Sequence, residues 1–306
     1  MTATVRSFVY LFLLAAMWGS SYALLKVMVE TLPPVTGTAV RVFLAGLLLI
    51  VILYAVGQRL PRGRVNWAWL FVIGATGSAV PFTLLAFAVE RIPSASVAVL
   101  MGATPLFTSV MAHLTTRDDQ LSVHKLIGIV LGLVGVAVLF GTEAVGGIAR
   151  NIWGMAAALA GSFSYALTNV VARRIVGESP VSAGAASAFC ALSVVVPWAL
   201  IAESPGTTLL GGEGSLRSWL ALLALAALSS ALGNVIFFRL IVLSGPTFVS
   251  LNNYLNPLIG TFWGVVLLGE SAQGQAFVAL ALILVGIAVA NWTALRSLAT
   301  RRATSV

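Results

Sequence analysis

The sequence predicts an all-α integral membrane protein with ten transmembrane helices, arranged as two inverted five-helix repeats. Three observations lead to this fold class. The 306 residues are 59% hydrophobic and only 8% charged, with a mean hydropathy of +1.04, whereas a soluble domain carries about 25% charged residues. Apolar segments long enough to cross a bilayer as helices recur along the chain. Features of the first half also return in the second half.

Ten apolar segments are separated by loops that contain proline, glycine or charged residues. They cover residues 6–28, 35–56, 67–89, 94–114, 125–141, 151–174, 181–201, 217–242, 246–267 and 272–293. This division predicts a first five-helix repeat at 1–141, a linker at 142–150, a second, inverted repeat at 151–293 and a cytoplasmic tail at 294–306.

The distribution of lysine and arginine predicts the orientation. Twelve of these residues fall on the side of the N-terminus and five on the opposite side. Because basic residues accumulate on the cytoplasmic side, both termini are predicted to be cytoplasmic. The first apolar segment is interpreted as a retained helix rather than a cleaved signal peptide, since no clear small-x-small site follows it.

Two alignments of the halves support the repeat. An offset of 143 residues aligns Tyr22 with Tyr165, and an offset of 152 aligns Pro105 with Pro257. Each half then holds five spans, and because five is odd the second half must be inverted in the membrane. Inverted repeats are common in secondary transporters, which bind substrate near the midplane where the halves meet.

Several motifs carry a family resemblance. The first span contains WGSSYALLK, the sixth FSYALTNVVARR and the ninth YLNPLIGTFWGVVLLGES, followed by LALILVGIAVA. In this order they resemble the EamA-type branch of the drug/metabolite transporter superfamily over nearly the whole chain. The resemblance implies ten helices and export of small metabolites, often amino acids or amphipathic compounds. TTRDD replaces the glycine-glutamate ending in the first half, so Asp119 and Glu270 are not expected to be equivalent.

Asn252, Asn253 and Asn256 form the densest polar group in any predicted span. Asn252 and Asn256 lie four residues apart and share a helix face with Trp263. Amides can meet both the ammonium and the carboxylate of an amino acid. Hydrogen bonding between helices is the alternative role, and the sequence leaves both roles open.

Aromatic and polar residues at corresponding positions of the halves add to this set. Tyr22 and Tyr165 are expected to flank a central cavity from opposite halves. Proline at 105 removes a helical hydrogen bond and should free the carbonyl of Met101. The predicted substrate-binding residues are Trp18, Tyr22, Ser78, Phe82, Met101, Tyr165, Asn169, Asn234, Phe238, Asn252, Asn253, Asn256 and Trp263.

Two basic residues lie within or near predicted spans. Lys26 closes the first span and Arg41 lies inside the second. Ionisable residues in a membrane are costly and often functional, so both are candidates to attract a substrate carboxylate. The alternative is that the side chains extend to the membrane interface.

Some function classes lack their motifs. The sequence has no GxxxxGK[ST] phosphate loop, no HExxH and no carboxylate near the centre of a predicted span. ATP-driven transport is therefore not expected, and no catalytic residue, cofactor or metal is predicted. The charged residues that give the net charge of +8 lie mostly between the predicted spans, so they do not indicate a nucleic-acid surface. The expected partners are a small-molecule substrate and membrane lipids, not nucleic acid.

The predicted function is export of small organic metabolites by alternating access across a bacterial-type inner membrane. Aromatic residues around the predicted centre favour aromatic or bulky apolar amino acids, in resemblance to the YddG-like aromatic amino acid exporters. Transport is expected to run downhill rather than by proton antiport. The alternatives are an ion or small-molecule channel, an exporter of threonine, homoserine or amphipathic drug-like compounds, and a membrane-embedded enzyme.

Overall fold

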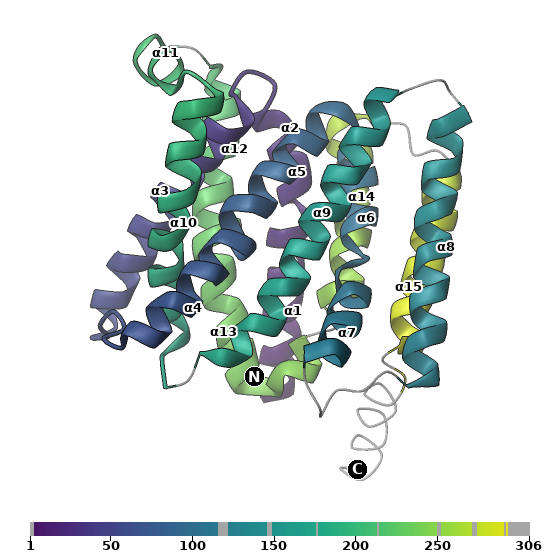
Figure 1. Cartoon of the computed structure of the whole chain (residues 1–306), viewed down its shortest axis with the longest axis horizontal. Helices are drawn as coiled ribbons and strands as arrows, with labels where there is room; N and C mark the ends of the chain where they lie inside the picture. The colour runs from purple at the N-terminus through teal and green to yellow at the C-terminus, as the bar shows by residue number, and fades with distance from the viewer. Residues whose placement is uncertain are drawn as a thin grey trace.

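The structure is a computed structural model that describes residues 3–115, 122–145, 149–175, 177–212, 214–249, 252–270 and 274–290, together with Trp292. Every regular element in this part of the chain is a helix, which confirms the all-α prediction there. Figure 1 shows the helices packed as a bundle, with the start of α1 and the end of α15 at the same end.

The helices follow one another with short connections. Up to residue 145 they are α1 (Ala3–Gly19), α2 (Ser21–Met28), α3 (Pro34–Ala55), α4 (Arg64–Gly74), the π-helix η1 (Ala75–Ala79), α5 (Val80–Arg91), α6 (Ser94–Met101), α7 (Thr104–Thr115) and α8 (Val123–Val145). The later ones are α9 (Ala149–Val171), the 3₁₀-helix η2 (Ala172–Arg174), α10 (Pro180–Ala202), α11 (Pro205–Leu210), α12 (Leu216–Ala224), the π-helix η3 (Leu225–Leu232), α13 (Gly233–Val249), α14 (Asn252–Leu268) and α15 (Gly274–Ala290).

Seven helical stretches among the described residues, two of them interrupted by short turns, are long and apolar enough to cross a bilayer. They are Val5–Met28, Pro34–Ala55, Arg64–Arg91, Ser94–Thr115, Ile152–Val171, Pro180–Ala202 and Leu216–Phe237. Shorter apolar helices cover Val123–Gly135, Leu255–Leu268 and Phe277–Val289. The protein is therefore a multi-pass, all-helical membrane protein.

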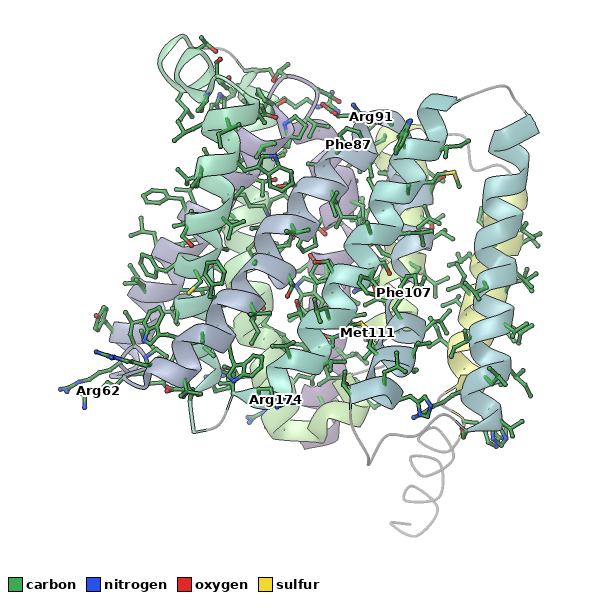
Figure 2. All side chains as sticks on the ribbon, viewed as in Figure 1. Arg62, Phe87, Arg91, Phe107, Met111 and Arg174 are labelled. Atoms are coloured by element: carbon green, nitrogen blue, oxygen red, sulfur yellow. The ribbon has the colours of Figure 1, made fainter. Side chains whose placement is uncertain are left out.

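Basic residues mark the two ends of the bundle. Arg91 lies at one end, whereas Arg62 and Arg174 lie at the other (Figure 2). We call these the Arg91 end and the Arg62 end.

The predicted break between the eighth and ninth spans is wrong. The sequence suggested that one helix ends at residue 242 and the next begins at 246, but α13 continues through Val249 and α14 begins at Asn252. Pro246 therefore lies inside α13. A proline removes one hydrogen bond of the helix, and within a membrane protein neighbouring groups satisfy the freed carbonyl, so the helix need not end there.

Pro105 has the opposite effect. The predicted fourth span is divided, because α6 ends at Met101 and α7 begins at Thr104 after a short turn. The hydroxyl of Thr104 donates a hydrogen bond of 2.8 Å to the carbonyl of Met101. The expectation that proline leaves this carbonyl outside the helical ladder is confirmed, and Thr104 supplies the missing donor.

Two π-helical segments interrupt long spans, and the sequence analysis did not predict them. The first, η1, contains Ser78 and the second, η3, contains Ser230. These serines align at an offset of 152 residues, so the two segments occupy corresponding positions of the two halves. Short π-helical segments occur frequently at functional sites.

Glycines bring α8 and α15 into backbone contact. A Cβ atom at Gly286 would lie 2.6 Å from the carbonyl oxygen of Gly128 and 3.0 Å from the amide nitrogen of Gly132. Figure 1 shows these two helices side by side along one edge of the bundle. Gly128, Gly132 and Gly286 thus serve helix packing, since small residues let helices approach closely.

Two carboxylates hold helix starts in place. Gly269 adopts a φ of +65°, a left-handed conformation that glycine adopts readily at helix ends, and ends α14; the amide of Glu270 donates a 3.1 Å hydrogen bond to the carbonyl of Gly264. The Glu270 carboxylate accepts hydrogen bonds from the amides of Ser94 (2.7 Å) and Ala95 (3.0 Å) at the start of α6. Unpaired amides at a helix start favour a negative charge there.

The second carboxylate acts in the same way on α3. Glu203 follows α10 and accepts from the amides of Val35 (3.1 Å) and Thr36 (2.8 Å). The residue corresponding to Glu270 in the first half, Asp119, lies outside the described residues.

Candidate functional site

The candidate site is centred on Arg41 in α3. Its side chain is buried, with 5% exposed. The guanidinium carbon lies 3.8 Å from the centre of the Phe82 ring on α5, within the range of a cation–π interaction. Its Nε donates a 3.0 Å hydrogen bond to the hydroxyl of Ser230 in η3. The alternative that Arg41 extends to the membrane interface is therefore wrong.

The positive charge of Arg41 has no described counter-ion. Among the carboxylates whose side chains the structure describes, none lies within the 4.0 Å of a salt bridge to Arg41. Arg91, in contrast, pairs with Glu90 at 2.8 Å, and Arg217 lies 3.5 Å from Glu30. Because burial of an unpaired charge is expensive, the Arg41 region has the electrostatic character of an anion site.

Two aromatic rings lie one after the other next to this charge, Phe82 against the guanidinium and Tyr165 against Phe82. The rings of Phe82 and Tyr165 are tilted by 60° with their centres 6.4 Å apart. Tyr22 is buried in the main hydrophobic cluster, and Tyr165 packs against the same cluster. Tyr165 thus lies beside the ring that covers Arg41, and it packs against the same hydrophobic cluster as Tyr22.

Trp18 contacts the second π-helical segment. Its Nε1 donates a 3.0 Å hydrogen bond to the carbonyl of Ser229, and its ring centre lies 5.4 Å from that of Phe237. The hydroxyl of Ser229 donates in return to the carbonyl of Met17 at 2.8 Å. These bonds hold α1 against η3, so the indole N–H of Trp18 is already occupied.

The first π-helical segment has a related contact with α9. The hydroxyl of Ser164 donates a 2.7 Å hydrogen bond to the carbonyl of Thr76. The hydroxyls of Thr76 and Thr168 lie 2.7 Å apart and form a second hydrogen bond. The first span of the second half thus holds η1, as the first span of the first half holds η3. The sequence analysis missed Thr76, Ser164 and Thr168, although hydroxyl residues inside apolar spans are a detectable signal.

Two more predicted residues donate side-chain hydrogen bonds, Asn234 within its own helical stretch and Asn169 to another helix. The amide of Asn234 donates a 2.7 Å hydrogen bond to the carbonyl of Ser230, the residue whose hydroxyl accepts from Arg41. Asn169 donates 3.3 Å to the hydroxyl of Thr108 on α7. Met101 is buried, and Ser78 is half-buried in η1. Asn234 therefore belongs to the Arg41 region, whereas Asn169 lies against α7.

The asparagines of α14 differ from these residues. Asn252 is only 2% exposed, and neither atom of its amide has a hydrogen-bond partner in the described part of the chain. The Oδ1 of Asn256 is likewise buried without a described partner. Buried amides normally have partners, so these atoms are available to water or to a ligand.

The remaining predicted residues are not grouped with Arg41. Trp263 is half-buried and its ring packs edge-on against the exposed ring of Phe262, with centres 5.7 Å apart. The side chains of Phe238 and Asn253 lie outside those that the structure describes.

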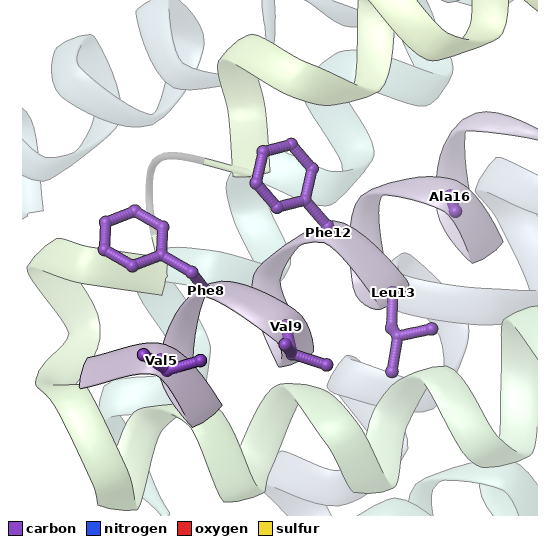
Figure 3. A pocket seen from close by; sticks show the side chains of 6 residues that line it. All are labelled: Val5, Phe8, Val9, Phe12, Leu13 and Ala16. Carbon is purple, nitrogen blue, oxygen red and sulfur yellow. The ribbon is translucent and has the colours of Figure 1, made fainter. Parts of the chain in front are cut away.

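Two surface pockets lie away from the Arg41 region. One, of about 400 Å³, is at the Arg91 end and is lined by Lys26, Val29, Glu30, Glu90 and Arg91. There the ammonium of Lys26 donates to the carbonyls of Val89 and Ile92. The other, of about 550 Å³, is an apolar groove on α1 lined by Val5, Phe8, Val9, Phe12, Leu13 and Ala16 (Figure 3). Exposed apolar side chains of this kind suit contact with lipid.

Comparison with known proteins gives consistent results over nearly the whole chain. The model of the EamA-like transporter family matches twice, at residues 6–141 and 152–292. The uncharacterized inner membrane transporter YedA of Escherichia coli (strain K12) is 31% identical over 90% of this chain and 88% of its own length. A probable amino-acid metabolite efflux pump of Salmonella typhimurium is 27% identical over 90% and 91%, respectively.

A protein of known crystal structure has a similar fold. It superposes with a TM-score of 0.64 over 95% of this chain and 98% of its own chain, at 21% sequence identity. At this identity the similarity shows the fold alone.

Proposed function

Since this chain belongs to the EamA-like transporter family, we propose that it is a secondary transporter that exports small organic metabolites, with amino acids as the first candidates. The similarity to an amino-acid metabolite efflux pump supports this substrate class. The observation that carries the proposal is the Arg41 region, where a buried cation, aromatic rings and hydroxyl groups from distant parts of the chain meet.

The aromatic lining favours aromatic or bulky apolar amino acids. Phe82, Tyr165 and Tyr22 offer ring surfaces that a phenyl or indole side chain can pack against. Aromatic pairs gain about 0.5–1.5 kcal/mol beyond the burial of their area. The unpartnered amides of Asn252 and Asn256 are proposed to meet polar groups of the substrate or its water on the way through the protein.

The proposed architecture has ten spans in two inverted repeats, at residues 1–141 and 151–293, with a linker between them and a cytoplasmic tail after residue 293. The double match of the family model supports a repeated unit. The corresponding positions of η1 and η3, and their bonds to α9 and α1, support the relation between the halves. The Arg41 region then lies where the repeats meet.

Contacts at the Arg91 end support the proposed alternating access. Glu203 joins α10 to α3, and Glu270 joins α14 to α6. In the proposed repeats these are the second and fourth spans of each half, so both contacts cross between the halves. Their separation would open the Arg91 end. The carboxylates with described side chains lie at helix ends or in loops, which supports downhill transport.

We place the protein in a bacterial-type inner membrane with both termini in the cytoplasm. The inner membrane location of YedA supports this placement. Arg62 and Arg174 lie together at one end of the bundle (Figure 2), which by the distribution of basic residues would face the cytoplasm. The Arg91 end would then face outward.

Efflux from proteoliposomes tests the proposed function. Purified protein is reconstituted in vesicles loaded with labelled phenylalanine, and unlabelled amino acids and amphipathic amines are added as competitors. We expect saturable efflux that continues without a proton gradient and that aromatic amino acids inhibit most. Inhibition by threonine or homoserine alone would overturn the substrate preference.

Two further outcomes separate the other function classes. Flux that does not saturate and runs at channel rates would replace the transporter by a channel. Efflux that stops when the proton gradient is removed, despite an outward substrate gradient, would overturn downhill transport. The appearance of a covalently altered lipid or substrate would indicate an enzyme.

A further inference from the structure

We propose that Arg41 binds the carboxylate of the transported substrate, and that the substrates are therefore monocarboxylates with an apolar body. This inference rests on the proposed transport function and makes it more specific. It assigns the recognition of the carboxylate to one residue, and it makes the amino group of an amino acid secondary.

The burial of Arg41 is the first argument. A guanidinium that is 5% exposed loses its hydration, and no carboxylate with a described side chain replaces that hydration within salt-bridge distance. The Phe82 ring and the Ser230 hydroxyl compensate only part of this loss. An anionic ligand would supply the missing charge, because paired charges are tolerated where single charges are not.

The unused donors of Arg41 are the second argument. A guanidinium carries five N–H donors in a fixed plane. Nε is bonded to the hydroxyl of Ser230, and the Phe82 ring covers one face of the plane. The two terminal nitrogens have no hydrogen bond to any described residue. An edge with two terminal N–H groups matches the two oxygens of a carboxylate.

A second arginine in the same chain shows the completed arrangement. Arg91 lies with its guanidinium carbon 3.2 Å from the centre of the Phe87 ring, and its Nη1 bonds to the carboxylate of Glu90 at 2.8 Å. Arg41 has the same stacking on Phe82 but lacks the carboxylate. We propose that the carboxylate of the substrate occupies at Arg41 the position that the carboxylate of Glu90 has at Arg91.

The surroundings favour one negative charge over two. Arg41 is the only cation among the described side chains that contact Phe82 or Ser230. A monocarboxylate would neutralise it, whereas a phosphate dianion would leave a net negative charge among buried aromatic groups. Tyr165 and the ring of Phe82 continue as an apolar wall beside the guanidinium, which suits a phenyl or branched aliphatic body.

The location between elements explains why this contact would matter for transport. Arg41 and Phe82 come from α3 and α5, whereas Ser230 and Tyr165 come from η3 and α9. A carboxylate held by Arg41 therefore lies beside groups from both halves of the chain, which are proposed to move against each other.

Three related compounds test the inference on the unaltered protein. Efflux of labelled phenylalanine from proteoliposomes is measured with 3-phenylpropionate, which keeps only the carboxylate, or with 2-phenylethylamine, which keeps only the ammonium. Protein-free vesicles correct for passive permeation. We expect the inhibitory concentration of 3-phenylpropionate to be at least about tenfold lower than that of the amine. The amine lacks the carboxylate and so loses one charge-assisted hydrogen-bonded contact. Equal competition by both, or better competition by the amine, overturns the inference.

Variants of Arg41 give an independent readout. Arg41→Gln is expected to raise the half-saturating phenylalanine concentration by roughly tenfold or more, and Arg41→Lys to raise it less because the charge remains. Arg174→Gln is the matched control, since Arg174 also lies over an aromatic ring, that of Trp69, but at the Arg62 end. Size-exclusion profiles and circular dichroism report whether each variant is folded.

The outcomes separate this inference from the proposed function. If the unaltered protein transports amino acids but Arg41→Gln, once folded, retains the original half-saturating concentration, the assignment of Arg41 is wrong and the transport function stands. If Arg41→Gln does not fold, the comparison of the three compounds decides alone. If the unaltered protein moves none of the tested compounds, the proposed function and this inference both fail.

Discussion

Glu270 and Ser94, which are 176 residues apart, are joined by two hydrogen bonds. The carboxylate of Glu270 accepts from the amide of Ser94 at 2.7 Å and from its hydroxyl at 2.9 Å. The positive φ of Gly269 ends α14 and turns the following residue back toward α6. A glycine-glutamate pair at the end of one span thus holds the start of another.

The first prediction concerns this contact. Glu270→Gln removes the negative charge and leaves one carbonyl oxygen for three donors, so we expect a loss of about 1 kcal/mol, as for other helix-capping groups. Thermal unfolding in detergent should show a lower Tm. Glu178→Gln is the control, because Glu178 accepts from the side chain of Asn66 at 2.8 Å rather than from a helix start. An equal or smaller effect at Glu270 than at Glu178 would contradict the capping role.

The second prediction concerns Phe82. Phe82→Leu keeps an apolar side chain but removes the ring that stacks on Arg41. Since a cation–π contact is worth roughly 0.5–2 kcal/mol, we expect the half-saturating substrate concentration to rise about two- to thirtyfold. Phe82→Tyr, which retains a ring, should change it less. Transport assays on folded variants measure this, and identical values for the leucine and tyrosine variants would count against the stacking.

The third prediction concerns Asn252. Its buried amide has no hydrogen bond to a described residue, so Asn252→Leu should leave the unfolding temperature unchanged or raise it, because replacing an unsatisfied polar group is not destabilising. Transport should nevertheless fall. Asn256→Ala and Tyr22→Ala are expected to reduce transport in the same assay. Normal transport in all three folded variants would mean that these residues serve packing rather than substrate binding.

The fourth prediction concerns the contact between α8 and α15. Gly286→Val would place a Cβ atom 2.6 Å from the carbonyl oxygen of Gly128, so the helices must move apart. Overpacking of this kind costs about 1–3 kcal/mol, and the Tm should fall accordingly. The control is Gly274→Ala, also in α15, where a Cβ atom meets no atom within 4 Å. A Gly286→Val protein as stable as the control would exclude backbone contact.

Much of the site could be anticipated from residue types, but the contacts at its centre could not. Tyr22 and Tyr165 were paired by an alignment of the two halves, and Tyr165 packs against the hydrophobic cluster that contains Tyr22. Arg41 is predicted from the sequence as a charge inside a span that could attract a substrate carboxylate, but its contacts with Phe82 and Ser230 are not, because these residues lie 41 and 189 positions away. Residue spacing along one helix carries no information about such contacts.

The positions of the helix breaks divide in the same way. Pro105 lies at the turn between α6 and α7, whereas Pro246 lies inside α13. Both prolines remove a helical hydrogen bond. Whether the helix ends depends on which neighbouring groups satisfy the freed carbonyl, as the hydroxyl of Thr104 does for Met101, and these neighbours are a property of the packed structure.

The sequence by itself determined the environment, the helical class and the family of this protein. An apolar chain with few charges must satisfy its backbone hydrogen bonds within each span, and helices do so locally. Only the tertiary structure decided that Arg41 is buried, that Ser230 and Phe82 contact it, and that η1 and η3 interrupt their spans. The reason is that burial, charge pairing and π-helical winding depend on groups brought together from distant parts of the chain.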